Sequence, residues 1–221
     1  EPAGLFPCVQ AMVGRDADIL LHINSGSASN KTLIWLHGLG ADSNDFAPFF
    51  SNPLFKEYEI ILPNAPYRKI TLNQNFEMRA WFNMKSLNLD DLNEEDFIES
   101  SKALDLIIED KLKTNPSSKI YIGGFSQGAA LSIFYGLKTL YKICGVVSFS
   151  GFVPKFNYQN TVIRKPVLKI HGFNDDIINF QTSENTFDLL NFSNLVSKSY
   201  NMGHEVIEDQ VVDLLSFLKE T

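Results

Sequence analysis

The sequence predicts a single α/β domain with a mostly parallel sheet and helices on both faces. Apolar, strand-like runs alternate along the chain with helix-like runs, which is the pattern of a parallel sheet covered on both sides. The chain has 221 residues, of which 44% are hydrophobic, and this suffices for one sizeable core. No repeat, low-complexity tract or linker divides the sequence, so residues 1–221 are expected to form one domain.

Eight segments have the β-branched and aromatic composition of strands. They are Asp18–Ser25, Thr32–His37, Glu57–Leu62, Arg79–Met84, Lys119–Gly123, Gly145–Ser150, Pro166–His171 and Leu195–Tyr200. The clearest helix is expected from about Asn93 to Lys113, because Asn93 can cap its first turn and Pro116 follows its end. A last helix is expected from Val206 to Lys219.

One short motif predicts a nucleophile. Residues 124–128 read Gly-Phe-Ser-Gln-Gly, a G-x-S-x-G pattern with a predicted strand before it and a small-residue helix after it. A strand, a tight turn and a helix around such a serine form a nucleophile elbow, which pushes the oxygen of Ser126 out above the sheet. The backbone N–H of Gln127 then points to where an oxyanion would form. The alternative is a glycine-rich turn with an incidental serine.

A base and an acid are expected after this serine, each following a later strand. Only two of the four histidines, His171 and His204, follow Ser126. His171 ends a strand-like run, whereas His204 stands in a loop after the last predicted strand and can reach over the serine. His204 is therefore the predicted base, and the alternative is a surface histidine that caps the last helix. Asp175 and Asp176 both qualify as the acid, and spacing alone does not choose between them.

Several segments together resemble the acyl-protein thioesterase, carboxylesterase and lysophospholipase family of small serine α/β-hydrolases. In chain order they are Leu33–Asp42, Leu62–Pro66, Trp81–Met84, Gly123–Leu131, His171–Asp175 and Gly203–His204. The resemblance implies an α/β-hydrolase fold with a minimal cap. It also implies that Asp175 is the acid, that the N–H of Leu39 is the second oxyanion donor, and that His37 shapes the oxyanion loop.

The chain departs from the family pattern at two places. Relatives usually have an aspartate where this chain has Asn83, so a local hydrogen bond is expected to differ. Residues 1–11 have no counterpart in the family pattern. They are interpreted as an expression remnant, a processed N-terminus or an extra edge strand.

Composition argues against several classes of protein. The net charge is −7 and no run of Lys or Arg occurs, which argues against nucleic-acid binding and against an electrostatic membrane anchor. No stretch approaches the roughly 20 apolar residues of a spanning helix. Two cysteines, Cys8 and Cys144, make neither a disulfide framework nor a metal cluster. These features predict a cytoplasmic protein that needs no metal and no organic cofactor.

Three side chains are predicted to border the acyl group: Trp81, Leu87 and Phe152. Leu87 belongs to a leucine-containing acidic segment, residues 86–92, which is either a flap over the acyl chain or a plain lead-in to the long helix. The segment Phe152–Lys165, where many lipases insert a helical cap, has room for a loop only. An open cleft over Ser126 is therefore expected.

The predicted function is a serine hydrolase that cleaves carboxylic esters or acyl thioesters through an acyl-enzyme. The expected substrate is a small acyl ester or an acylated protein. A lysophospholipase is the alternative among enzymes, and a catalytically silent α/β-hydrolase used as a binding module is the alternative outside them. The resemblance also leaves open a homodimer.

Overall fold

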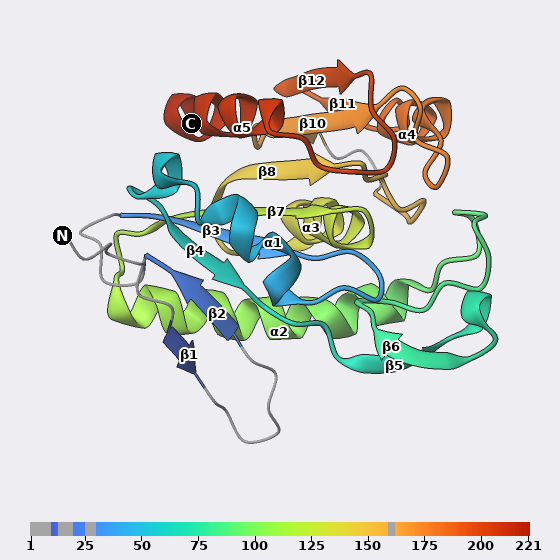
Figure 1. Cartoon of the computed structure of the whole chain (residues 1–221), viewed down its shortest axis with the longest axis horizontal. Helices are drawn as coiled ribbons and strands as arrows, with labels where there is room; N and C mark the ends of the chain where they lie inside the picture. The colour runs from blue at the N-terminus through green and yellow to red at the C-terminus, as the bar shows by residue number, and fades with distance from the viewer. Residues whose placement is uncertain (1–9, 13–19, 25–29, 159–161) are drawn as a thin grey trace, which may run out of the picture.

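The computed structural model describes residues 10–12, 20–24, 30–158 and 162–221 (Figure 1). Its main sheet has eight strands in the order β1-β2-β4-β3-β7-β8-β10-β12. Their bounds are β1 Gln10–Met12, β2 Leu20–Ile23, β3 Lys31–Leu36, β4 Glu59–Leu62, β7 Lys119–Phe125, β8 Ile143–Phe149, β10 Val167–Gly172 and β12 Leu195–Tyr200. All neighbours from β4 to β12 pair in parallel, while β2 runs antiparallel to both β4 and β1. The mostly parallel sheet is thereby confirmed.

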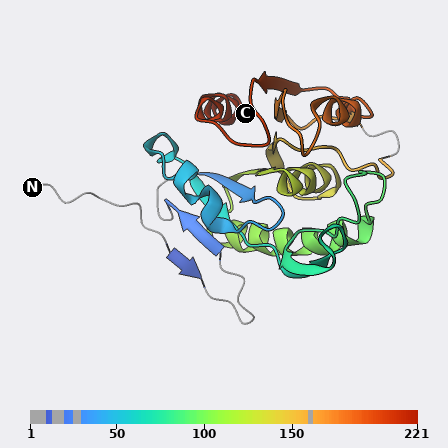
Figure 2. The same ribbon diagram turned by 45° about the vertical axis from the view of Figure 1, so that its right-hand side comes forward.

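Helices cover both faces of this sheet because successive strand residues point to opposite sides. Leu33 and Trp35 of β3 belong to one buried cluster, and Ile34 and Leu36 belong to the other. The first cluster is completed by α1 (Ser43–Phe50) and α5 (Asp209–Glu220), and the second by α2 (Glu94–Thr114), α3 (Gln127–Lys138) and α4 (Phe180–Phe187). Figures 1 and 2 show these helices arranged around the strands.

The long helix α2 begins as the sequence predicts. The side chain of Asn93 accepts a hydrogen bond from the backbone N–H of Glu95, at 3.2 Å, and thereby satisfies one free donor of the first turn. Three acidic residues follow in that turn, where the helix dipole favours negative charge. Local signals therefore suffice to define this helix start.

The predicted strand Arg79–Met84 is wrong. A separate antiparallel hairpin of β5 (Tyr67–Ile70) and β6 (Phe76–Arg79) ends where that strand was expected to begin. Beyond it the backbone is irregular and bonds to side chains instead of a neighbouring strand. The N–H of Trp81 donates to Gln127 Oε1 at 2.8 Å, and the N–H of Asn83 donates to Asp96 Oδ2 at 2.8 Å. The apolar composition reflected burial, not strand pairing.

Two further expectations concern the edge strand next to β2 and the connection between β8 and β10. An edge strand, β1, pairs antiparallel with β2, while residues 1–9 lie outside the described residues. Between β8 and β10 the described residues hold a loop and the two-residue strand β9 (Val162–Ile163), which pairs with β11 (Asn191–Phe192). Within residues 150–158 and 162–166 no helix stands over the sheet, as the minimal cap requires. No described helix is long and apolar enough to cross a membrane.

Candidate active site

Ser126 stands at the sharp turn between β7 and α3. Its φ and ψ are 55° and −116°, a conformation that non-glycine residues rarely adopt. The surrounding structure holds it there: the N–H of Ser126 donates to the carbonyl of Phe149 at 2.9 Å, and its own carbonyl accepts from the N–H of Ala130 at 3.1 Å. The serine is thus fixed between the end of β8 and the first turn of α3, which is the geometry of a nucleophile elbow.

Glycines make this turn sterically feasible. A Cβ atom at Gly128 would lie 2.2 Å from the carbonyl oxygen of Leu36 and 2.6 Å from that of His37. A Cβ atom at Gly124 would lie 2.6 Å from the carbonyl carbon of Gly128. All these neighbours are backbone atoms of the central strands and the elbow, so they cannot move aside as flexible side chains do. The two motif glycines let α3 approach the sheet closely.

We expect Gly128→Ala to lower the free energy of unfolding by about 1–3 kcal/mol or more, because the added methyl group overpacks against β3. Gly203→Ala is the control, since the nearest atom to its Cβ would be the Asn174 carbonyl oxygen at 3.9 Å. The control should stay within about 0.5 kcal/mol of the wild type. Urea denaturation measures both, and equal stability of the two variants would contradict the close approach.

Hydrogen bonds connect Ser126 to two further side chains, His204 and Asp175. His204, in the loop after β12, has its Nε2 atom 2.9 Å from Ser126 Oγ and its Nδ1 atom 2.7 Å from Asp175 Oδ2. An ionised carboxylate only accepts, so Nδ1 of His204 carries the proton and donates it to Asp175. Nε2 is then free to accept the hydrogen bond of the Ser126 hydroxyl, as a general base must.

Asp175 is buried and held by several donors, whereas Asp176 is exposed. The Oδ1 atom of Asp175 accepts hydrogen bonds from the N–H groups of Ile177 at 3.0 Å and Ile178 at 2.8 Å. Burial by itself raises the pKa of the Asp175 carboxyl, but hydrogen bonds from His171, from His204 and from the Ile178 amide outweigh it and hold that pKa well below its usual range. Asp175 is therefore a carboxylate at neutral pH.

The two predicted oxyanion donors stand close to the serine. As the first residue of α3, Gln127 has a backbone N–H without a partner inside its helix. Leu39 follows Gly38, whose Cβ position lies 3.6 Å from Ser126 Cβ. Leu39 and Ser126 also line one cavity. The geometry is compatible with two N–H groups aimed at one oxygen atom.

His37 and Trp81 hold the loop that carries Leu39. His37 is buried, its Nε2 atom accepts from the N–H of Ala65 at 3.0 Å, and its Nδ1 atom donates to the carbonyl of Gly38 at 2.8 Å. Burial lowers the pKa of His37, which agrees with this neutral, bridging imidazole. The indole N–H of Trp81 donates to the carbonyl of His37 at 2.9 Å. His37 is structural, as the resemblance implied.

A cavity of about 720 Å³ lies beside Ser126 and His204. Most of its wall is apolar, and the charged side chains in the wall are Asp45 and Glu205. The other lining residues are Gly38, Leu39, Ala41, Phe46, Pro48, Phe49, Phe125, Ile177 and Val206. The contribution of α1 to this wall was not predicted from the sequence. The aromatic run Phe46, Phe49 and Phe50, close after the oxyanion loop, was the available signal.

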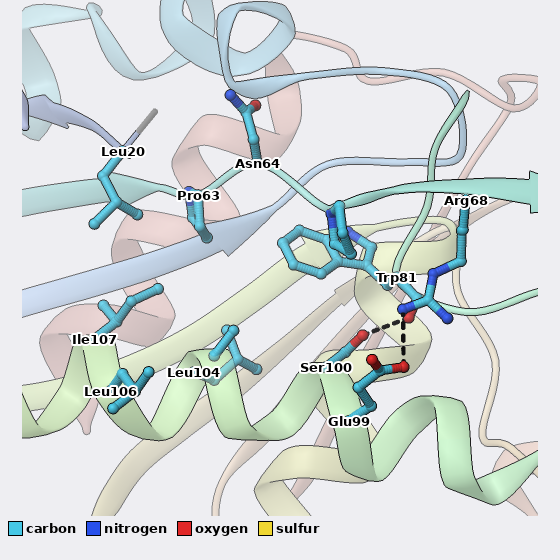
Figure 3. A pocket seen from close by; sticks show the side chains of 12 residues that line it. Leu20, Pro63, Asn64, Arg68, Trp81, Glu99, Ser100, Leu104, Leu106 and Ile107 are labelled. Carbon is cyan, nitrogen blue, oxygen red and sulfur yellow. Dashed lines mark hydrogen bonds and ion pairs between the residues drawn. The ribbon is translucent and has the colours of Figure 1, made fainter. Parts of the chain in front are cut away.

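The structure does not bring the three predicted acyl-contacting residues into this cavity. Phe152 is buried in the core, and Leu87 is 55% exposed on the segment before α2. Trp81 borders a second cavity of about 390 Å³, which shares no lining residue with the first. Figure 3 shows that cavity between α2 and the chain that follows β4, with Ser100 and Arg68 near the Trp81 ring. Trp81 is linked to the predicted oxyanion loop by its hydrogen bond to the carbonyl of His37.

Proteins of similar sequence show the family to which this chain belongs. Residues 19–221 match the family described as Phospholipase/Carboxylesterase. The chain belongs to this family. It is 33% identical over 217 residues to an acyl-protein thioesterase 1 of Candida albicans, covering 88% of this chain and 94% of that protein. It is 31% identical over 218 residues to an acyl-protein thioesterase 1 of Yarrowia lipolytica, covering 90% and 96%.

Solved structures of similar proteins share the fold. The acyl-protein thioesterase 2 of Zea mays superposes with a TM-score of 0.80 at 23% identity, covering 91% of this chain and 97% of that one. A carboxylesterase of Bacillus cereus gives a TM-score of 0.73 at 22% identity, covering 91% and 94%. The α/β-hydrolase fold and the family resemblance are confirmed. Family members are serine hydrolases of esters and thioesters, and this chain is one of them. Among the described residues, no cluster of His, Cys, Asp and Glu could hold a metal ion.

Proposed function

We propose that this protein is an acyl thioesterase and esterase whose catalytic triad is Ser126, His204 and Asp175. The observation that carries the proposal is the continuous hydrogen-bonded line from Ser126 Oγ through His204 to the buried Asp175 carboxylate, at 2.9 and 2.7 Å. A silent binding module has no need to keep all three groups in contact. The strained backbone of Ser126 supports the same role, because such strain gathers at active sites.

The proposed reaction has two halves. Ser126 Oγ attacks the acyl carbonyl carbon while Nε2 of His204 takes its proton, and Asp175 stabilises the imidazolium that forms. The oxyanion accepts hydrogen bonds from the N–H groups of Leu39 and Gln127. His204 then gives the proton to the leaving sulfur or oxygen, and an acyl-enzyme remains. Water, deprotonated by His204, then attacks the acyl carbon of this ester. The bond to Ser126 Oγ breaks, Oγ takes the proton back from His204, and the carboxylic acid is released.

An acylated cysteine of a protein or peptide is the favoured substrate. The small cap leaves Ser126 beside an open cavity, which admits an acyl group attached to something large. The apolar wall suits an alkyl chain. The relatives named acyl-protein thioesterase point the same way. A cytoplasmic location and a homodimer stay predictions.

The test uses the purified protein with three acyl donors of equal chain length: an S-acylated cysteine peptide, a lysophosphatidylcholine and a p-nitrophenyl ester. We expect the S-acylated cysteine peptide to have the highest kcat/KM of the three donors. We also expect a fluorophosphonate probe to label this protein at Ser126, as located by proteolysis and mass spectrometry. A preference for the lysophospholipid would favour the lysophospholipase alternative. Labelling at another serine, or no turnover of any donor, would contradict the proposal.

The charge of the cavity wall leads to a prediction about the leaving group. Asp45 and Glu205 make the wall negative, and a cavity lined by one sign of charge repels substrates of that sign. At low salt we expect an acyl-coenzyme A to be cleaved about tenfold less efficiently than the same acyl group on an uncharged thiol. Added salt should narrow this ratio because it screens the repulsion. Asp45→Asn should narrow it as well, while Glu99→Gln, which lies at the second cavity, should leave it unchanged. A ratio insensitive to salt and to Asp45 would contradict the prediction.

Two exposed side chains allow a matched test of acyl-chain contact. Ile177 is 49% exposed and lines the cavity beside Ser126, whereas Leu87 is 55% exposed and does not. Burial of each CH₂ group contributes about 0.8 kcal/mol, so kcat/KM should rise with acyl length by up to about fourfold per CH₂ until the wall ends. We expect Ile177→Ser to flatten this dependence from C2 to C12 and Leu87→Ser to leave it parallel to the wild type. The reverse result would assign the acyl site to the predicted Leu87 flap.

A further inference from the structure

Asp175 faces two histidines with the same carboxylate oxygen. Oδ2 lies 2.7 Å from Nδ1 of His204 and 3.2 Å from Nε2 of His171. His171 stands at the end of β10, four residues before Asp175, and the side chains of both residues are almost completely buried, at 1% and 0% exposure. His171 does not touch Ser126 or line the cavity, so the proposed reaction leaves it without a role.

The hydrogen-bond partners of His171 define it as a donor. Its Nε2 atom lies 2.7 Å from the carbonyl oxygen of Ile178, and a carbonyl only accepts. Nε2 therefore carries the proton and donates it to the Ile178 carbonyl, and the same N–H group lies 3.2 Å from Asp175 Oδ2. Nδ1 has no hydrogen-bond partner in the described part of the chain. The ring packs edge-on against Phe180, with the centroids 6.0 Å apart, which fixes its plane.

Both oxygens of Asp175 are contacted by donors. Oδ1 accepts from the amides of Ile177 and Ile178, and Oδ2 accepts from His204 and lies 3.2 Å from Nε2 of His171. These contacts on both oxygens restrict rotation of the carboxylate. The other charged pair along this strand, Lys169 with Glu184 of α4, is bonded within itself. His171 is thus a second titratable group, besides His204, that contacts Asp175.

We propose that His171 is a positioning residue of the triad, which aims Asp175 Oδ2 at Nδ1 of His204. This inference rests on the proposed triad. Without the contact from His171 the carboxylate can turn away from His204, which lowers kcat.

The test compares His171→Leu with His171→Gln, using a p-nitrophenyl ester and the full chain. A Gln amide can place its nitrogen close to the position of Nε2 and donate to the same acceptors, whereas Leu donates nothing. We expect His171→Leu to lower kcat about 10- to 100-fold, the effect of losing a hydrogen bond to a charged group. KM should change little. His171→Gln should recover most of kcat.

Several outcomes would overturn the inference. A wild-type kcat in His171→Leu would do so, and so would an equal loss of kcat in a folded His171→Gln variant. If His171→Leu does not fold, His171→Asn replaces it, because its shorter amide stays polar without reaching Asp175. Retained turnover in Ser126→Ala would instead reject the triad itself, so the two failures are distinguishable.

Discussion

Ser126→Ala should abolish turnover of p-nitrophenyl esters and acyl thioesters, with a loss in kcat of about 10⁴-fold or more. The alanine lacks the oxygen that attacks the acyl carbon, and no other hydroxyl is hydrogen-bonded to Nε2 of His204 among the described residues. Folding should survive, because alanine carries the same Cβ as serine at the positive φ of the elbow. The oxyanion donors and the cavity stay in place, so substrate binding should persist.

Ser117→Ala is the matched control. Ser117 is an exposed serine just before the first residue of β7, whereas Ser126 follows the last residue of that strand. It should retain wild-type kcat and fluorophosphonate labelling, while Ser126→Ala loses both. Circular dichroism and urea unfolding should show both variants folded. Near wild-type activity in purified Ser126→Ala would reject the assignment of the nucleophile.

Asp175→Asn should cost about 10⁴-fold in kcat, whereas Asp176→Asn should change it by no more than about a factor of two. An amide at position 175 presents a donor or a weaker acceptor to Nδ1 of His204 and favours the wrong tautomer of the imidazole. Asp176 is exposed, and no hydrogen bond links it to His204 in the described structure. The isosteric substitution keeps the shape of both side chains, so packing does not confuse the comparison.

The pH dependence of stability provides a second measure of the same carboxylate. The pKa of Asp175 is lowered in the folded protein, so the unfolded chain binds the extra proton as the pH falls through the usual carboxyl range. Asp175 therefore stabilises the fold above that range and loses this contribution in acid. Asp175→Asn should flatten the acid side of the stability curve relative to Asp176→Asn. If Asp176→Asn proved the more damaging to kcat, the acid role would belong to Asp176.

The elbow was predictable because its signals are local. The spacing of Gly124, Ser126 and Gly128 lies within five residues, and the strand before and the helix after are both evident in composition. The position of the predicted base, His204, in the loop after the last strand also followed from the sequence alone. In the same way, the capping residue Asn93 marked the start of α2.

Other features depended on packing between distant segments. The acid remained ambiguous from spacing, and the burial of Asp175 against the amides of residues 177 and 178 distinguishes it from Asp176. Residues 80–84 looked like a strand, but their amides bond to Gln127 and Asp96, far along the chain. Neither partner could be inferred from the local sequence.

The sequence by itself determined the α/β class, the elbow and the two candidates for the acid, because strand period, glycine spacing and capping act over a few residues. Only the tertiary structure decided which side chains surround the serine. Phe49 of α1 and Ile177 line the cavity, Leu87 does not, and His171 contacts Asp175. The physical reason is that Phe49 and Ile177 lie far from Ser126 along the chain, so the local periodicity of their segments carries no record of that neighbour. His171 and Asp175 are close in sequence, but they meet because the chain turns back at the end of β10.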